Sequence, residues 1–141
     1  MKHKGSKCDL NMYRDRDLQR TFKKVYSENP CTIFMELVKI ICASPAERFW
    51  VSEERAVAVV SQIERGVSLD GMNRERIAMY TEIYRRYVLL RQKHPSFSMS
   101  RLVSIIVHQP APRFYLTAGT ARVMLYKLFR KCKEQRKLQL R

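Results

Sequence analysis

The sequence predicts an all-α protein, made of two tandem three-helix units that pack into one compact body of about six helices. Three observations lead to this fold class. Apolar residues recur at intervals of three and four residues in several segments, which places them on one face of a helix. No segment alternates apolar and polar residues over a sustained length, so we expect no β-sheet.

The third observation is an internal repeat. Shifting the sequence by 65 residues aligns residues 35–65 with residues 100–130 without a gap. The longest shared element is Pro-Ala-x-Arg-Phe-(Trp/Tyr)-(Val/Leu)-(Ser/Thr), at 45–52 and again at 110–117. A repeat within one chain indicates duplicated structural units. We therefore expect the residues that the copies share to determine the architecture, and those that differ to carry the function.

The repeat and the turn-forming residues divide the chain into five parts. The expected parts are a basic flexible arm over 1–16, a first three-helix unit over 17–67, a linker over 68–73, a second, strongly basic three-helix unit over 74–133 and a polar tail over 134–141. The linker is predicted from its sequence Ser-Leu-Asp-Gly-Met-Asn, which is rich in turn formers.

Within each unit, prolines separate the helices, because proline lacks the amide proton and restricts the residue before it. The helices expected in the first unit cover 17–28, 32–43 and 52–65. Those expected in the second unit begin near Asn73, at Ser98 or Ser100, and at Thr117. Ser52 and Thr117 are expected to cap the last helix of each unit, and Gly66 to end the first of these.

The repeated element has a direct packing interpretation. Its proline ends a helix, and its aromatic pair fills the gap where two helices diverge. Val51 or Leu116 then precedes the N-cap of the next helix as a hydrophobic staple. Arg48 and Arg113 have two interpretations, binding of free carbonyls at the preceding helix end or contact with a phosphate.

The charge of the chain points to a polyanionic partner. The net charge is +15, which favours nucleic acid ahead of a membrane surface. Residues 17–67 carry seven basic and seven acidic residues, whereas residues 82–133 carry eleven basic residues and a single acidic one, Glu82. A surface without carboxylates suits a phosphate backbone, because each Lys or Arg that contacts it releases counterions.

The last helix of the second unit, 117–133, is therefore the expected nucleic-acid-binding helix. Its apolar stripe faces the core, namely Ala121, Met124, Leu125 and Leu128. The candidate nucleic-acid-binding residues are Arg113, Thr117, Gly119, Thr120, Arg122, Val123, Tyr126, Lys127, Arg130 and Lys131. The cationic side chains among them are expected to contact phosphates. Those nearest the bases are expected to be Gly119, Thr120, Arg122, Val123 and Tyr126.

Other classes of function lack support in the sequence. The cysteines and histidines are not spaced as metal ligands, so we expect free thiols, with no metal or other cofactor. There is no nucleophile motif and no glycine-rich phosphate loop, so we expect neither an enzyme nor a small-molecule substrate. The apolar run at 33–43 contains Glu36 and Lys39. We therefore expect no membrane span, and a cytoplasmic protein that associates with the nucleoid if it binds DNA.

Three short helices with a tight turn before the last resemble the tri-helical group that includes homeodomains and Myb repeats. The resemblance covers nearly the whole chain as a pattern of helices, without the diagnostic residues of those families. It implies a helix-turn-helix in which the last helix enters the major groove. The Pro-Ala-x-Arg-Phe-(Trp/Tyr) element also resembles one in small uncharacterised bacterial proteins, and that likeness implies no function.

Taken together, these features predict a non-enzymatic protein that binds double-stranded DNA, as a small bacterial transcriptional or mobile-element accessory factor. Two alternatives remain open. The chain could be an adaptor that binds an acidic protein partner, with the first unit as a second docking surface. It could also bind RNA, whose recognition modules usually present exposed aromatic rings for stacking.

Overall fold

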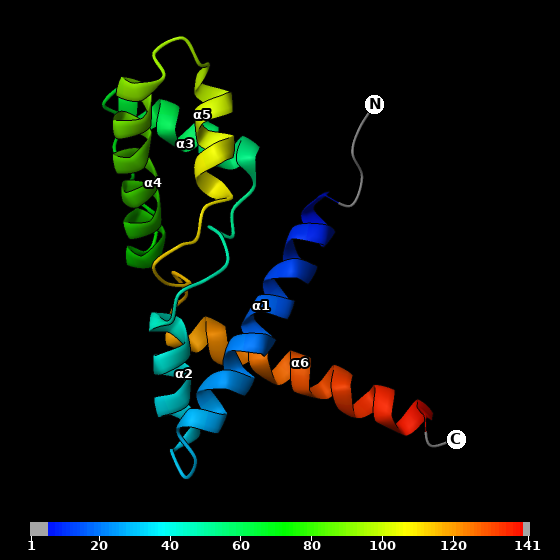
Figure 1. The fold of residues 1–141 in the computed structure, drawn as a ribbon. Coiled ribbons are helices and arrows are strands. Elements are labelled where there is room, and N and C mark those ends of the chain that lie inside the picture. Colours follow the sequence, from blue (N-terminus) through cyan, green and yellow to red (C-terminus); the bar gives the residue numbers. More distant parts are fainter. Residues whose placement is uncertain (1–5, 140–141) are drawn as a thin grey trace.

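The computed structural model describes residues 6–139, which form six α-helices and no β-strand (Figure 1). In chain order the helices are α1 (Ser6–Glu28), α2 (Phe34–Ala43), α3 (Glu53–Glu64), α4 (Arg74–Lys93), α5 (Met99–Val107) and α6 (Ala118–Gln139). The all-α class and the number of helices are confirmed. The predicted N-caps Ser52 and Thr117 are confirmed, since their side-chain oxygens accept from the first helical turn. Asn73 and Ser98, near which two further helices were expected to begin, cap α4 and α5 in the same way.

Both ends of the chain are more helical than the sequence analysis expected. Residues 6–16 of the predicted flexible arm belong to α1, and the rest of that arm, residues 1–5, lies outside the described residues. Residues 134–139 of the predicted tail extend α6. The physical reason is the same at both ends, because neither segment contains a proline or glycine that would end a helix.

One glycine explains why the last helices of the two repeats differ in length. α3 ends before Gly66, whose φ of 76° is the left-handed conformation typical of a helix C-terminus. The repeat places Lys131 at the matching position of α6. Since lysine favours the helical conformation, α6 continues for two more turns.

The six helices form two groups of three, and each group contains helices from both repeats. α1, α2 and α6 pack together, and α3, α4 and α5 pack together; these are the lower and upper parts of the molecule in Figure 1. Among the described residues, α6 makes no helix contact with α4 or α5, and α3 makes none with α1 or α2. This grouping differs from the expected tandem units, because the last helix of each repeat packs on the first two helices of the other.

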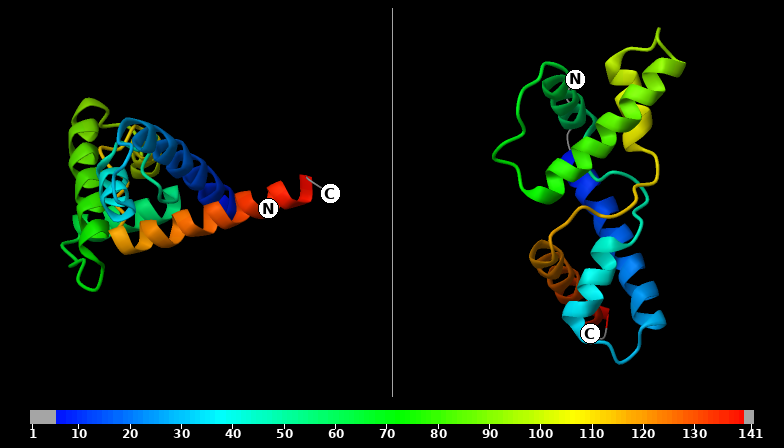
Figure 2. Two further views of the ribbon diagram at one scale, coloured as in Figure 1. Left: turned by 90° about the horizontal axis from the view of Figure 1, so that it is seen from below. Right: turned by 90° about the vertical axis from the view of Figure 1, so that its left-hand side faces the viewer.

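This exchange of the last helices between the two repeats takes place where the two copies of the repeated element cross. We call residues 44–52 and 108–117 the crossing segments, and Figure 2 shows them running between the two groups. They meet in an antiparallel bridge at Ala46 and Ala111, in which each amide donates to the other residue's carbonyl at 3.0 Å. Because these two residues occupy the same place in the repeat, the crossing is symmetric.

A second symmetric pair of hydrogen bonds joins the crossing segments to the helix ends. The amide of Phe49 donates to the carbonyl of Val107 at 3.0 Å, and the amide of Phe114 donates to the carbonyl of Cys42 at 3.2 Å. Both carbonyls lie in the last turn of a helix, where they have no helical partner. Each copy of the repeated element therefore caps the second helix of the other copy.

The packing interpretation of the aromatic pair is confirmed, although the rings fill the gap between the two repeats and not a gap within one. Phe49 and Phe114 are buried, and Tyr115 stacks on Phe49 with ring centroids 6.1 Å apart. Complete burial of one such side chain stabilises a fold by about 1.5–3 kcal/mol. The two repeats are thus joined by an apolar contact as well as by backbone hydrogen bonds.

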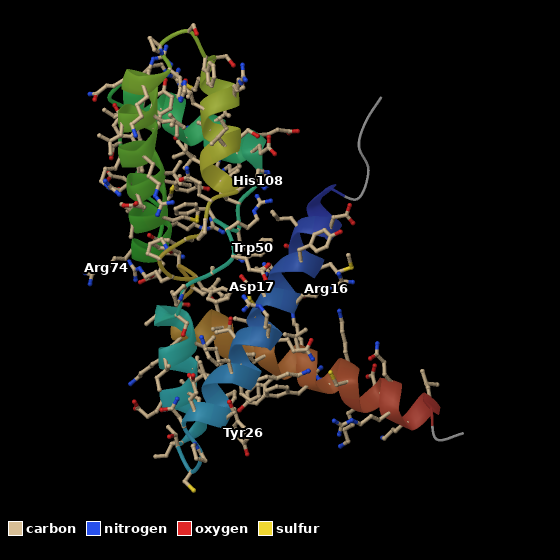
Figure 3. The ribbon with its side chains drawn as sticks, viewed as in Figure 1. Arg16, Asp17, Tyr26, Trp50, Arg74 and His108 are labelled. Carbon is tan, nitrogen blue, oxygen red and sulfur yellow. The ribbon has the colours of Figure 1, made fainter. Side chains whose placement is uncertain are left out.

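A buried carboxylate on α1 holds the first crossing segment, and the sequence analysis missed it. Asp17 is 1% exposed and accepts from the amide of Glu47 and from Nε1 of Trp50, both at 2.9 Å (Figure 3). Arg20 also donates to its carboxylate. Extending the repeat towards the N-terminus would have paired Asp17 with Glu82, an acidic residue at the same position of α4.

The second repeat makes the corresponding attachment differently, because Pro112 replaces Glu47 and has no amide proton to donate. Glu82 accepts instead from Arg85 and Arg86 at 2.8 and 2.7 Å, and hydrogen bonds from these guanidinium groups lower the pKa of Glu82 to about 2. Arg86 then donates to the carbonyl of Pro110 at 3.1 Å. An arginine thus links this carboxylate to the crossing segment.

We predict that Asp17→Ala lowers the free energy of unfolding by about 3 kcal/mol, because it leaves the amide of Glu47 and the indole N–H of Trp50 without their acceptor. Chemical denaturation followed by circular dichroism measures this loss. Asp15→Ala is the matched control, since Asp15 contacts its neighbour Arg14 and not the crossing segment, and it should cost less than about 1 kcal/mol. Equal losses for the two variants would contradict the role given to Asp17.

Candidate nucleic-acid interface

The inward face of α6 is the one that the apolar stripe predicted, but it packs on different helices. Ala121 and Leu125 are buried, and the half-buried residues continue the stripe along α6, namely Met124, Leu128, Phe129 and Cys132. The ring of Phe129 packs against that of Phe22 on α1, with centroids 5.0 Å apart. The first repeat thus supports the helix that the sequence assigned to the second.

Nine of the ten predicted site residues lie together on α6 or its N-cap, and all nine are exposed: Thr117, Gly119, Thr120, Arg122, Val123, Tyr126, Lys127, Arg130 and Lys131. Thr117 accepts from the amide of Thr120 at 3.2 Å, so its hydroxyl serves as the helix cap. A side chain at Gly119 would meet no atom within 4 Å. Packing within the protein therefore gives no reason for a glycine there, and the backbone is open to an approaching ligand.

The tenth predicted residue, Arg113, lies in a crossing segment and binds within the protein. Its Nη1 donates to Oε1 of Glu75 at 2.8 Å, and its guanidinium lies 4.7 Å from the ring centroid of Tyr115. Its counterpart Arg48 donates to the carbonyls of Phe49 and Val51, which belong to its own segment and not to the preceding helix end. Both arginines therefore make structural contacts.

The charge of α6 is not balanced within the protein. The helix carries seven Lys and Arg residues and one acidic residue, Glu134. None of the seven forms an ion pair with any of the described residues. Six of them lie between Lys127 and Lys137. The C-terminal end of α6 extends beyond α1 and α2 (Figures 1 and 2). This arrangement concentrates positive potential on a projecting helix.

One aromatic ring lies among these cations. Tyr126 is 48% exposed, and one side of its ring stacks on Phe34 of α2, with centroids 5.2 Å apart and planes inclined by 24°. Tyr126 is out of register with the apolar stripe of α6. No local pattern in the sequence links it with Phe34, because the two residues lie on helices far apart in the chain.

A second polar cluster lies at the end of α5. His108 contacts Glu53 at 2.9 Å through Nε2 and Arg48 at 3.4 Å through Nδ1 (Figure 3). Hydrogen bonds from His108 and Ser104 lower the pKa of Glu53 below its usual value. The cluster connects the end of α5 with the start of α3, and we assign it a structural role.

Other kinds of site have little basis in the described residues. No three His, Cys, Asp or Glu side chains among them lie close enough to hold a metal ion. Cys31, Cys42 and Cys132 are free thiols, and burial together with the charge of Glu75 raises the pKa of Cys42 to about 11. None of the described helices combines the length and apolar character needed to cross a bilayer. Two hollows of about 680 and 400 Å³ border the loop between α3 and α4, away from α6.

Comparison with protein-family models, curated proteins and solved structures gave no match to this chain. The interpretation of the site therefore depends on the packing, exposure and charge of α6.

We predict that Arg113 and Glu75 are energetically coupled in the folded protein. In a double-mutant cycle with Arg113→Ala and Glu75→Ala, the coupling energy should be about 0.5–1 kcal/mol, the range of a partly exposed ion pair. Chemical denaturation of the wild type, the two single variants and the double variant provides the four free energies. Strictly additive effects would contradict the contact and would leave Arg113 available for a ligand.

Proposed function

We propose that the protein binds nucleic acid through α6, with double-stranded DNA as the first ligand to consider. The observation that carries the proposal is the group of seven Lys and Arg residues on an exposed helix, none of them paired with a carboxylate among the described residues. The inward side of the same helix is fixed by α1 and α2, which supports a rigid presentation of its outward side.

Physical dimensions favour this ligand. An α-helix with its side chains is about 10–12 Å across, and the major groove of DNA is about 12 Å wide. In the proposed complex, the phosphate contacts are supplied by Lys127, Arg130 and Lys131, which are exposed on α6. Arg122 and Val123 lie on the outward side of the first half, where a guanidinium or a methyl group can contact base edges. No catalytic step is part of this function.

The exchange of helices changes how a helix-turn-helix interpretation applies to the chain. α5 precedes the turn but does not contact α6, so α2 occupies the position of the supporting helix. In this proposal the tri-helical unit consists of α1, α2 and α6. A role as a small bacterial transcriptional or mobile-element accessory factor in the cytoplasm fits such a unit. An acidic protein partner is the second candidate, because the same unpaired cations would attract it.

The direct test is a fluorescence-anisotropy titration of a mixed-sequence DNA duplex at two salt concentrations. We expect Arg122→Glu/Lys127→Glu to weaken binding at least about tenfold at low salt, and to reduce the slope of log K against log salt by about two. The control Arg55→Glu/Arg65→Glu makes the same change in net charge on α3 and its C-cap, and it should weaken binding less than about threefold.

Equal losses for the two double variants would mean that net charge and not α6 governs binding. Absence of binding by the wild type at low salt would refute the proposed function. Where the wild type does bind the duplex, competition with an acidic polypeptide tests the second candidate. A true acidic protein partner would displace the labelled duplex at lower concentrations than unlabelled DNA does.

A further inference from the structure

A connected group of aromatic rings lies behind the exposed Tyr126. Phe34 covers one side of its ring, and Phe34 also contacts Phe129, with ring centroids 6.3 Å apart. Phe129 packs on Phe22, and Phe22 on Tyr26. A continuous group of four aromatic rings from α1, α2 and α6 thus supports Tyr126. Because Phe34 covers one side of the Tyr126 ring, the exposed area of Tyr126 lies on the other side and the edge of that ring.

Cations lie on both sides of this ring along the helix. Arg122 and Arg130 are four residues before and after Tyr126, so they lie one turn away on the same side of α6. Both are exposed, and neither pairs with a carboxylate among the described residues. Ile33, next to Phe34 at the start of α2, is 74% exposed and adds apolar surface.

A free ring face between cations matches an unpaired nucleotide better than a base pair. In a duplex, neighbouring base pairs cover the faces of each base, so a protein reaches edges, sugars and phosphates. An unpaired base offers its face, and proteins that bind single strands combine aromatic platforms with cations along the backbone. Arg122 and Arg130 are placed to contact the phosphates on either side of such a base.

We propose that Tyr126 is a stacking platform for an unpaired base, and that the α6 site therefore prefers single-stranded nucleic acid to a fully paired duplex. The inference rests on the proposed binding of nucleic acid through α6, and it places single strands ahead of the duplex as the ligand of that site. Cations hold the backbone of either form, whereas the ring contributes to binding of the single strand alone.

The test compares one fluorescent oligonucleotide as a single strand and as a duplex, titrated with the full-length protein. We expect the wild type to bind the single strand at least about fivefold more tightly. Tyr126→Ala should lose about tenfold in affinity for the single strand and less than about twofold for the duplex. Tyr126→Phe keeps the ring and should bind both as the wild type does.

Two further measurements keep the result interpretable. Tyr13→Ala is the matched control, since Tyr13 is 50% exposed on α1 and lies beside Arg16, and it should leave both affinities unchanged. With the wild type and Tyr126→Phe, a 2-aminopurine base in the single strand should be quenched on binding, as stacked bases are. This readout remains available if Tyr126→Ala fails to fold.

Wild-type affinity of a folded Tyr126→Ala for the single strand would overturn the inference, as would tighter binding of the duplex or an unquenched 2-aminopurine. In each of these cases, loss of binding by Arg122→Glu/Lys127→Glu would still support the proposed function. If that charge variant also bound as the wild type does, both proposals would fail, and an apolar partner protein would be the better explanation of the exposed rings.

Discussion

The architecture depends on the four backbone hydrogen bonds between the two copies of the repeated element. A chain that passes between two groups of helices must satisfy its buried amides and carbonyls, and here each copy does so for the other. The Ala46–Ala111 bridge aligns the crossing segments, and the amides of Phe49 and Phe114 complete the ends of α5 and α2. The grouping of the helices follows from this crossing, because it determines which helices α3 and α6 pack against.

The crossing also determines where the charge of the chain is concentrated. The first repeat is neutral when its residues are counted along the sequence, but in space its first two helices support the basic α6. The aromatic residues behind Tyr126 come from the same two helices, namely Phe22 and Phe34. The candidate site is therefore built from both repeats, and neither repeat alone would contain both the cations and the aromatic support.

Local features of this fold could be predicted from the sequence, and long-range ones could not. N-caps such as Ser52 and the outward positions of α6 follow from residues a few positions apart. The grouping of the helices does not, because α2 and α5 have similar apolar stripes and α6 could pack on either. Arg113 was assigned to the site for the same reason, since its partner Glu75 lies far away in the sequence.

The most direct test of the account is the nuclear Overhauser spectrum of the aromatic side chains in the full-length protein. The exchange of helices predicts cross-peaks from the ring of Phe129 to those of Phe22 and Phe34, whose centroids lie 5.0 and 6.3 Å away. Cross-peaks from α6 to the core residues of α4 and α5, in place of these, would contradict it. The helices of each repeat would then pack in chain order, and the aromatic support of Tyr126 would not exist.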